Sequence, residues 1–134
     1  MCYLGAVETP KRLSATFFRQ SESEPVRDWL LSLPKDERKI VGADIKTVEF
    51  GWPIGMPTCR PMGQGLFEVR SNLPNRIARV LFCIEAGRMV LLHGFIKKDR
   101  ETPDADLELA RERMKLVVRV RRLVIAASAK HSSK

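Results

Sequence analysis

GLFEVRSNLPNRIARVLFCIEAGRMVLLHGFIKKDRET, residues 65–102, is the stretch that decides the fold. It contains three short apolar runs, and turn residues separate each run from the next. Such runs predict three β-strands, and strands that follow one another through short turns usually pair antiparallel. Successive side chains of a strand point to opposite faces of its sheet. Because the helices before this stretch can cover only one face, the alternation predicts that Arg70 and Arg79 lie on an open, cationic face.

The chain before this stretch predicts one strand and two helices. Residues 13–19 contain two adjacent phenylalanines and favour a strand. Two apolar stripes with helical spacing follow, one before Pro34 and one after it. Because aromatic residues on such stripes usually belong to the core, we expect both tryptophans to be core residues rather than a ligand cage. The stripe residues are Val26, Trp29, Leu30, Leu33, Val41, Ile45, Val48 and Trp52.

The chain after this stretch predicts a third helix. Thr102 can cap a helix, Pro103 suits its first turn, and Asp104 is favoured near the positive end of the helix dipole. Apolar residues then recur with helical spacing. We expect this helix to end near Leu123 or Ile125.

The predicted fold class is therefore α+β, with elements in the order β-α-α-β-β-β-α. We expect an antiparallel sheet of about four strands, with the two N-terminal helices packed on one face, and a C-terminal helix. A further short edge strand is expected near residues 58–61. The domain would span residues 13–125, between an N-terminal lead of residues 1–12 and a disordered basic tail of residues 126–134.

The composition favours a polyanionic partner. The chain has 134 residues, a formal net charge of +8 and a pI of about 9.9. The positive excess lies in residues 60–100 and 111–134. Three dispersed cysteines without a CxxC spacing argue against a disulfide framework or a zinc site, which fits a cytoplasmic protein. No apolar run reaches the ~20 residues needed to cross a bilayer, so we expect no membrane partner.

Four segments in this order resemble a known family: GLFEVR, RIARVLF, LLHGFIKKDRETP and DADLELARER. They are similar to the HigB-like branch of the RelE/ParE toxin superfamily, which includes phage-derived members of toxin–antitoxin systems. The upstream SEPVRDWLLSLP is similar to the first helix of that branch, and the resemblance covers about residues 13–118. It implies a RelE-like fold, cleavage of mRNA in the ribosomal A site, and a small cognate antitoxin, often with a helix-turn-helix domain.

RNA cleavage of this kind has three chemical requirements. The 2′-hydroxyl, which is the nucleophile, must lose its proton. The negative charge of the pentavalent phosphate must be stabilised, and fixed cations on a rigid sheet can do this. The leaving 5′-oxygen must gain a proton, which a histidine or a lysine could supply. We therefore expect a toxin that needs neither a metal nor another cofactor.

The resemblance assigns these roles to basic residues of the last strands. Arg79 matches the arginine that we assign to the scissile phosphate, and Lys97 and Lys98 match a basic pair for phosphate binding or acid–base catalysis. His93 is either a proton carrier or a core histidine. Arg70 either binds RNA or forms a structural ion pair. The predicted catalytic residues are Arg79, Lys97, Lys98 and His93, and the predicted RNA-binding residues are Arg70, Arg76 and Arg100.

Two other functions stay open. One is a ParE-like gyrase poison without nuclease activity, and the other is a non-catalytic nucleic-acid-binding module that uses the basic C-terminal segment. Many ribosome-dependent relatives place a tyrosine or a second histidine near the last strand or the C-terminus. Here the sole tyrosine is Tyr3, and His131 lies in the predicted tail, so the sequence does not exclude either alternative.

Overall fold

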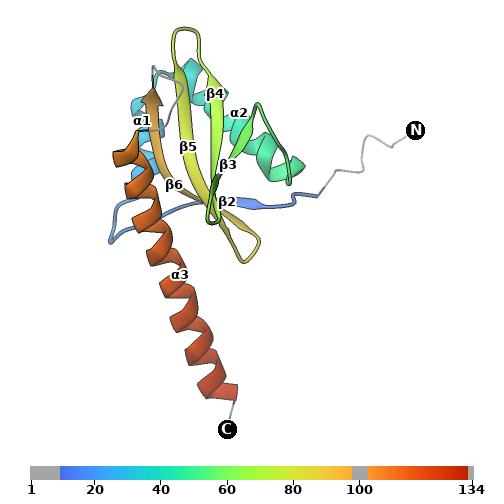
Figure 1. Ribbon diagram of the computed structural model, residues 1–134, viewed down its shortest axis with the longest axis vertical. Coiled ribbons are helices and arrows are strands. Elements are labelled where there is room, and N and C mark those ends of the chain that lie inside the picture. Colours follow the sequence, from blue (N-terminus) through green and yellow to red (C-terminus); the bar gives the residue numbers. More distant parts are fainter. Residues whose placement is uncertain (1–9, 98–102, 133–134) are drawn as a thin grey trace, which may run out of the picture.

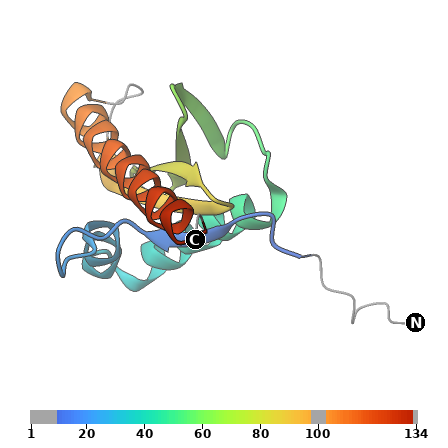
Figure 2. The same ribbon diagram turned by 90° about the horizontal axis from the view of Figure 1, so that it is seen from below.

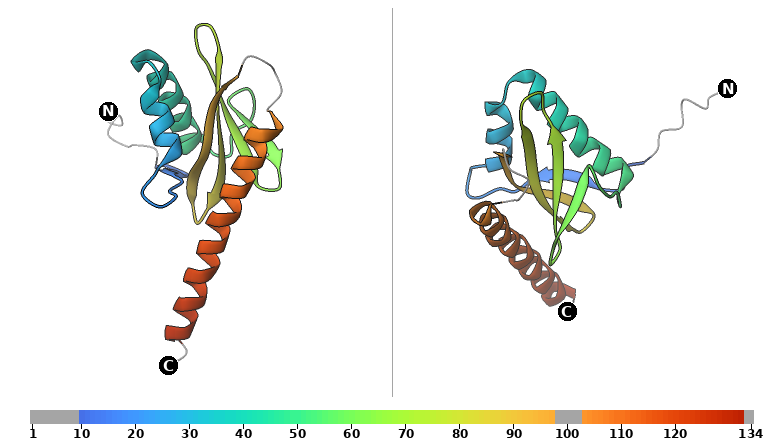
Figure 3. Two further views of the ribbon diagram at one scale, coloured as in Figure 1. Left: turned by 90° about the vertical axis from the view of Figure 1, so that its left-hand side faces the viewer. Right: turned by 45° about the horizontal axis from the view of Figure 1, so that its top comes forward.

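The computed structural model describes residues 10–97 and 103–132 of the chain. A five-stranded mixed sheet lies between two helices on one face and a third helix on the other (Figure 3, left). This confirms the predicted α+β class and the predicted element order, including the short edge strand expected near residues 58–61, which is β3. The elements are β2 (Ser14–Phe17), α1 (Pro25–Ser32), α2 (Lys35–Gly51), β3 (Cys59–Gly63), β4 (Leu66–Asn72), β5 (Ile77–Glu85), β6 (Arg88–Lys97) and α3 (Asp104–Ser132).

The sheet has the strand order β2-β6-β5-β4-β3, and its first pair differs from the prediction. Strands β3 to β6 pair antiparallel, but β2 pairs parallel with β6. Short turns fix the direction of β3 to β6, whereas β2 is separated from β6 by two helices and three strands, so no turn sets their relative direction. Glu49 of α2 holds β2 in place, because its Oε2 accepts a hydrogen bond of 2.7 Å from the Ala15 amide.

Helices α1 and α2 cover one face of the sheet, and their apolar stripes form the larger core (Figure 1). Val26, Val41 and Val48 are fully buried there. Trp29 lies directly over Gly94 of β6, where a Cβ would overlap its ring. Trp52 packs edge-on against Phe67, with ring centroids 4.9 Å apart. The expectation that both tryptophans belong to the core is therefore confirmed.

Helix α3 covers the opposite face, which we expected to be open (Figure 2). It packs four apolar side chains against the sheet, and the fully buried Leu66, Leu81 and Leu92 lie in this second core. Residues of both strand faces are therefore buried, and the alternation of the sequence could not reveal this. The helix residues in this core are Leu107, Ala110, Met114 and Val117.

Helix α3 is also longer than expected. It continues past Leu123 and Ile125 to Ser132, through residues that we expected to form a tail. Its C-terminal half projects well beyond the edge of the sheet (Figure 1). In the part of the chain that the structure describes, no helix is long and apolar enough to cross a membrane.

Candidate functional site

Arg79 occupies the predicted face of the sheet but is not open to solvent. Residue alternation places it on the same face of β5 as Leu81 and Cys83, which contact α3. Only 1% of its side chain is exposed, and its Nη1 donates a hydrogen bond of 3.0 Å to Oε1 of Glu68, which is equally buried. The prediction of an exposed Arg79 is therefore wrong, because its side chain is buried and the neighbouring strand supplies a carboxylate.

Further cations lie on the same face of the neighbouring strands. Arg70 of β4 is directly opposite Arg79 in the strand register and is half-buried. Lys97 of β6 is two residues beyond Phe95, the β6 partner of Arg79, and is 8% exposed. Arg60 of β3 is exposed and lies opposite Glu68. We call Arg60, Arg70, Arg79 and Lys97 the cationic row.

The charge of the cationic row exceeds what Glu68 can balance. Two like charges directly opposite each other in a sheet destabilise it, and Arg70 and Arg79 form such a pair. Glu68 pairs with Arg79, and Arg60 and Arg70 on the same face are exposed and half-buried, respectively. The geometry therefore suits an additional anion, such as a phosphate, on this face.

His93 is tied to the start of α3. Its Nε2 lies 2.5 Å from Oδ1 of Asp106, and its ring stacks on Phe95 with centroids 5.4 Å apart. The histidine side chain is 17% exposed, so it is neither a buried core residue nor freely open to solvent. A carboxylate at Nε2 fixes the orientation of the ring. His93 shares the α3 face with Arg79 but stands one residue pair further along β6, opposite Leu81.

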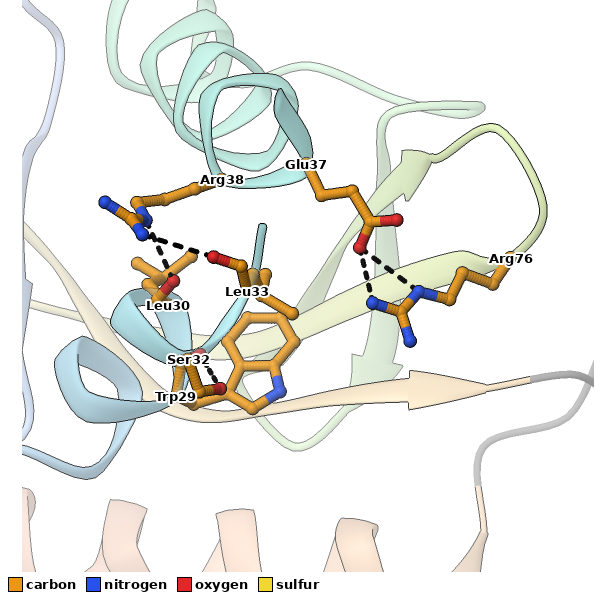
Figure 4. A network of polar contacts seen from close by, with 7 residues as sticks. All are labelled: Trp29, Leu30, Ser32, Leu33, Glu37, Arg38 and Arg76. Carbon is orange, nitrogen blue, oxygen red and sulfur yellow. Dashed lines mark hydrogen bonds and ion pairs between the residues drawn. The ribbon is translucent and has the colours of Figure 1, made fainter. Parts of the chain in front are cut away.

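Arg76 points away from the cationic row. Its guanidinium binds Oε1 of Glu37, with the Nε donor at 3.1 Å, and Figure 4 shows this pair at the start of α2. On the same side of the sheet, Arg38 donates hydrogen bonds to backbone carbonyls of Leu30 and Leu33 and so joins the two N-terminal helices. The structure therefore gives Arg76 a role in binding α2 to the sheet, and it does not place Arg76 beside Arg79.

Two predicted residues, Lys98 and Arg100, lie outside the described residues, as does Tyr3. The adjoining end of β6 is described up to Lys97.

Two arginines of α3 hold this helix on the cationic face. Arg111 donates to the backbone carbonyl of Met62 at 3.0 Å and to the side chain of Gln64 at 3.1 Å. Arg113 donates to the carbonyl of Leu92 at 2.8 Å and lies over the Phe18 ring, 5.7 Å from its centroid. Burial lowers the pKa of Arg113. The helix is thus attached to the sheet by polar contacts as well as by its apolar stripe.

Sequence reasoning missed three of these residues. Glu68 pairs with Arg79 because of the strand register, which the sequence alone does not give. Asp106 lies in a helix that follows residues 98–102, so its contact with His93 depends on tertiary structure. Arg60 lies in the proline-containing segment before β4. The only sequence signal that it faces away from the α1–α2 core was its position next to the apolar Cys59 in a short strand. Among the residues described, no group of three or more His, Cys, Asp or Glu side chains could hold a metal ion.

Residues 28–115 match the model of the phage-derived Gp49-like protein family (DUF891). The chain belongs to the Gp49-like family. This family belongs to the RelE-like group of type II toxin–antitoxin toxins. The match runs from α1 to the middle of α3, so it includes the whole cationic row, His93 and Asp106. A search of curated proteins gives no match.

Proposed function

We propose that this Gp49-like protein is the toxin of a type II toxin–antitoxin system, and that it inhibits translation by cleaving mRNA on the ribosome in the cytoplasm. The observation that supports the proposal most strongly is the cationic row. Arg60, Arg70, Arg79 and Lys97 share one face of four neighbouring strands, where Glu68 pairs with Arg79. We place the protein in the HigB-like branch of the group on the segments GLFEVR and LLHGFIKKDRETP.

The proposed reaction is an attack of the RNA 2′-hydroxyl on the adjacent phosphate. The O–P bond to the 2′-oxygen forms, the bond to the 5′-oxygen breaks, and the products carry a 2′,3′-cyclic phosphate and a 5′-hydroxyl. Arg70 and Arg79 would stabilise the negative charge of the transition state. Lys97, Lys98 or His93 would move the proton, and the mechanism needs no metal. Arg100 would bind the RNA backbone beside them.

Access to Arg79 sets a condition on this mechanism. Arg70 and Arg60 can meet an RNA backbone in the described conformation, whereas Arg79 is covered. The His93–Asp106 contact and the Arg111 contacts attach the first half of α3 over this face. We propose that RNA first binds Arg60 and Arg70, and that the start of α3 moves away from β6 before Arg79 contacts the scissile phosphate.

One observation favours the ParE-like alternative. Arg79 is buried and paired with Glu68, as expected for a structural ion pair rather than for a substrate-binding group. A gyrase poison needs only a binding surface, so a closed cationic row would not impair it. This alternative predicts DNA damage with intact transcripts.

Expression in growing cells separates the two functions. Production of the wild-type chain should arrest growth and give new 5′ ends within coding sequences, whereas the Arg79→Ala/Lys98→Ala double variant should do neither. A matched control is Arg27→Ala, which removes an exposed arginine of α1. Growth arrest with intact mRNA, or full toxicity of the double variant with wild-type cleavage, would reject the proposed nuclease site.

A further inference from the structure

An apolar groove lies beside the middle of α3. It lies between that helix and the β2–β6 edge of the sheet and encloses about 950 Å³. Phe17, Phe18 and Val90 form its floor, and Leu116, Val117 and Val120 form its helical wall. This groove is separate from the cationic row, whose residues do not line it.

The helical wall of the groove is exposed to an unusual degree. Val120 is 59% exposed and Leu116 is 40% exposed, and they stand one helical turn apart. Both lie near the middle of α3, next to Val117, which packs against the sheet. Exposed apolar side chains that continue the wall of an apolar groove indicate an interaction surface.

The shape of the groove favours a helix over a strand as its occupant. A peptide strand would have to add to the free edge of β2, but α2 already covers part of this edge. The Glu49 carboxylate accepts the Ala15 amide, and the Glu49 carbonyl accepts the amides of Arg12 and Leu13. An amphipathic helix needs no backbone partner and binds through apolar side chains at i and i+4.

The charges around the groove favour an acidic occupant. Arg19 and Arg88 are exposed and line the groove together with Glu85, so its lining has more positive than negative side chains. The full chain carries a formal net charge of +8. A second copy of this chain would bring the same positive charge to the interface, which disfavours self-association. An acidic helix would gain from these charges.

We propose that this groove binds an acidic amphipathic helix of the antitoxin, with apolar side chains of that helix seated on Phe17, Val90 and Val120. The identity of the partner rests on the proposed toxin function. The antitoxin then contacts the middle of α3, and the residues of the cationic row do not line its site.

The test uses the full chain and the antitoxin produced from the adjacent reading frame. Titration calorimetry compares the wild type with the Leu116→Glu/Val120→Glu variant, which should bind at least tenfold more weakly and escape neutralisation in cells. Leu31→Glu is the matched control, because Leu31 is 54% exposed on α1, away from the groove. It should bind as the wild type does. Arg19→Glu/Arg88→Glu should also weaken binding and reduce its dependence on salt.

Each other outcome overturns the inference in a distinct way. If the antitoxin neutralises the wild type and binds the Leu116→Glu/Val120→Glu variant equally well, the groove is not its site, although the toxin function stands. If the substitution instead dissociates a dimer in sedimentation equilibrium, the occupant is a second copy. If it abolishes binding of a single-stranded RNA oligonucleotide and leaves antitoxin binding intact, the occupant is RNA. If the neighbouring protein does not bind the wild type, both the partner and this inference are rejected, whereas the cleavage assay still tests the nuclease.

Discussion

Glu68 and Arg79 form an ion pair of 3.0 Å across two neighbouring strands, and each side chain is 1% exposed. Removing one member of a buried pair leaves the charge of the other member without its partner. This relationship makes Arg79 a structural residue as well as a candidate catalytic residue. Experiments on Arg79 must therefore measure folding and activity separately.

Stability measurements should reveal this pair as a strong coupling. Arg79→Met should lower the free energy of unfolding by about 3 kcal/mol or more, because it leaves the Glu68 carboxylate buried without this guanidinium. The double variant Glu68→Gln/Arg79→Met should recover a large part of that loss, because no uncompensated charge remains. Urea denaturation of the two single variants and the double variant checks this. Strictly additive losses would show that the pair is not coupled.

Gly94 should not tolerate a side chain. A Cβ on Gly94 would overlap the Trp29 ring, so Gly94→Ala must displace α1 or the ring. We expect a loss of about 1–3 kcal/mol in the free energy of unfolding, as for an overpacked core. Gly42→Ala in α2 is the control, since nothing lies within 4 Å of its Cβ position. There a gain of about 0.5–1 kcal/mol is expected. Similar effects at both positions would contradict the packing of Trp29 on β6.

Glu49 should determine the stability of the parallel edge strand. Its carboxylate accepts the Ala15 amide at 2.7 Å and contacts Lys11 Nζ at 3.4 Å. Glu49→Ala should cost about 1–3 kcal/mol, because the partly buried amide loses its acceptor. Lys11→Ala should cost less than about 1 kcal/mol, because the Lys11 side chain is 48% exposed and solvent screens its ion pair. Hydrogen exchange of the Ala15 amide should accelerate in the first variant only. Unchanged protection in Glu49→Ala would exclude this anchoring role.

The buried thiols should make stability fall at high pH. Burial, with a smaller effect of Glu68, raises the pKa of Cys59 from 9.0 to about 11. Burial and Glu85 raise the pKa of Cys83 to about 11 as well. Between about pH 9 and pH 11, the unfolded chain ionises these thiols while the folded chain keeps them protonated, so the free energy of unfolding decreases as the pH rises. Stability below pH 9 should not depend on them.

Urea denaturation from pH 8 to pH 11 measures this effect. The Cys59→Ala/Cys83→Ala variant should show a flatter decline than the wild type, whatever its stability at pH 8. In a Cys2→Ser background, both thiols should also react slowly with a disulfide reagent at pH 8 and react rapidly in urea. Equal pH slopes for the two proteins would show that the pKa values are not raised.

Local sequence patterns predicted the elements and most of the core. The stripe of Val41, Ile45 and Val48 is buried as its spacing predicts. Alternation along β5 also placed Arg79 on the correct face. These predictions succeed because they depend on periodicity and neighbouring residues alone.

Contacts between distant segments could not be predicted in this way. The parallel pairing of β2 with β6 joins residues such as Phe17 and Leu91. The packing of α3 on the face of the sheet that carries Leu81, and the partner that Glu37 provides for Arg76, likewise depend on how whole elements pack. The assignment of Arg79 to an open face failed because α3 packs on that face. The apolar stripe of a helix shows that the helix packs on a sheet, but it does not indicate which face of the sheet it covers.

Cleavage of ribosome-bound mRNA by the purified protein tests the central claim most directly. The claim is that the cationic row stabilises the charge on a scissile phosphate. Arg70→Ala removes the accessible cation opposite Arg79 without opening the Glu68–Arg79 pair, and Arg27→Ala removes an exposed arginine on the far face. Under single-turnover conditions, Arg70→Ala should cleave about 100-fold more slowly than the wild type. Arg27→Ala should cleave at the wild-type rate. Cleavage by folded Arg70→Ala at the wild-type rate, or no cleavage by the wild type, would contradict the account.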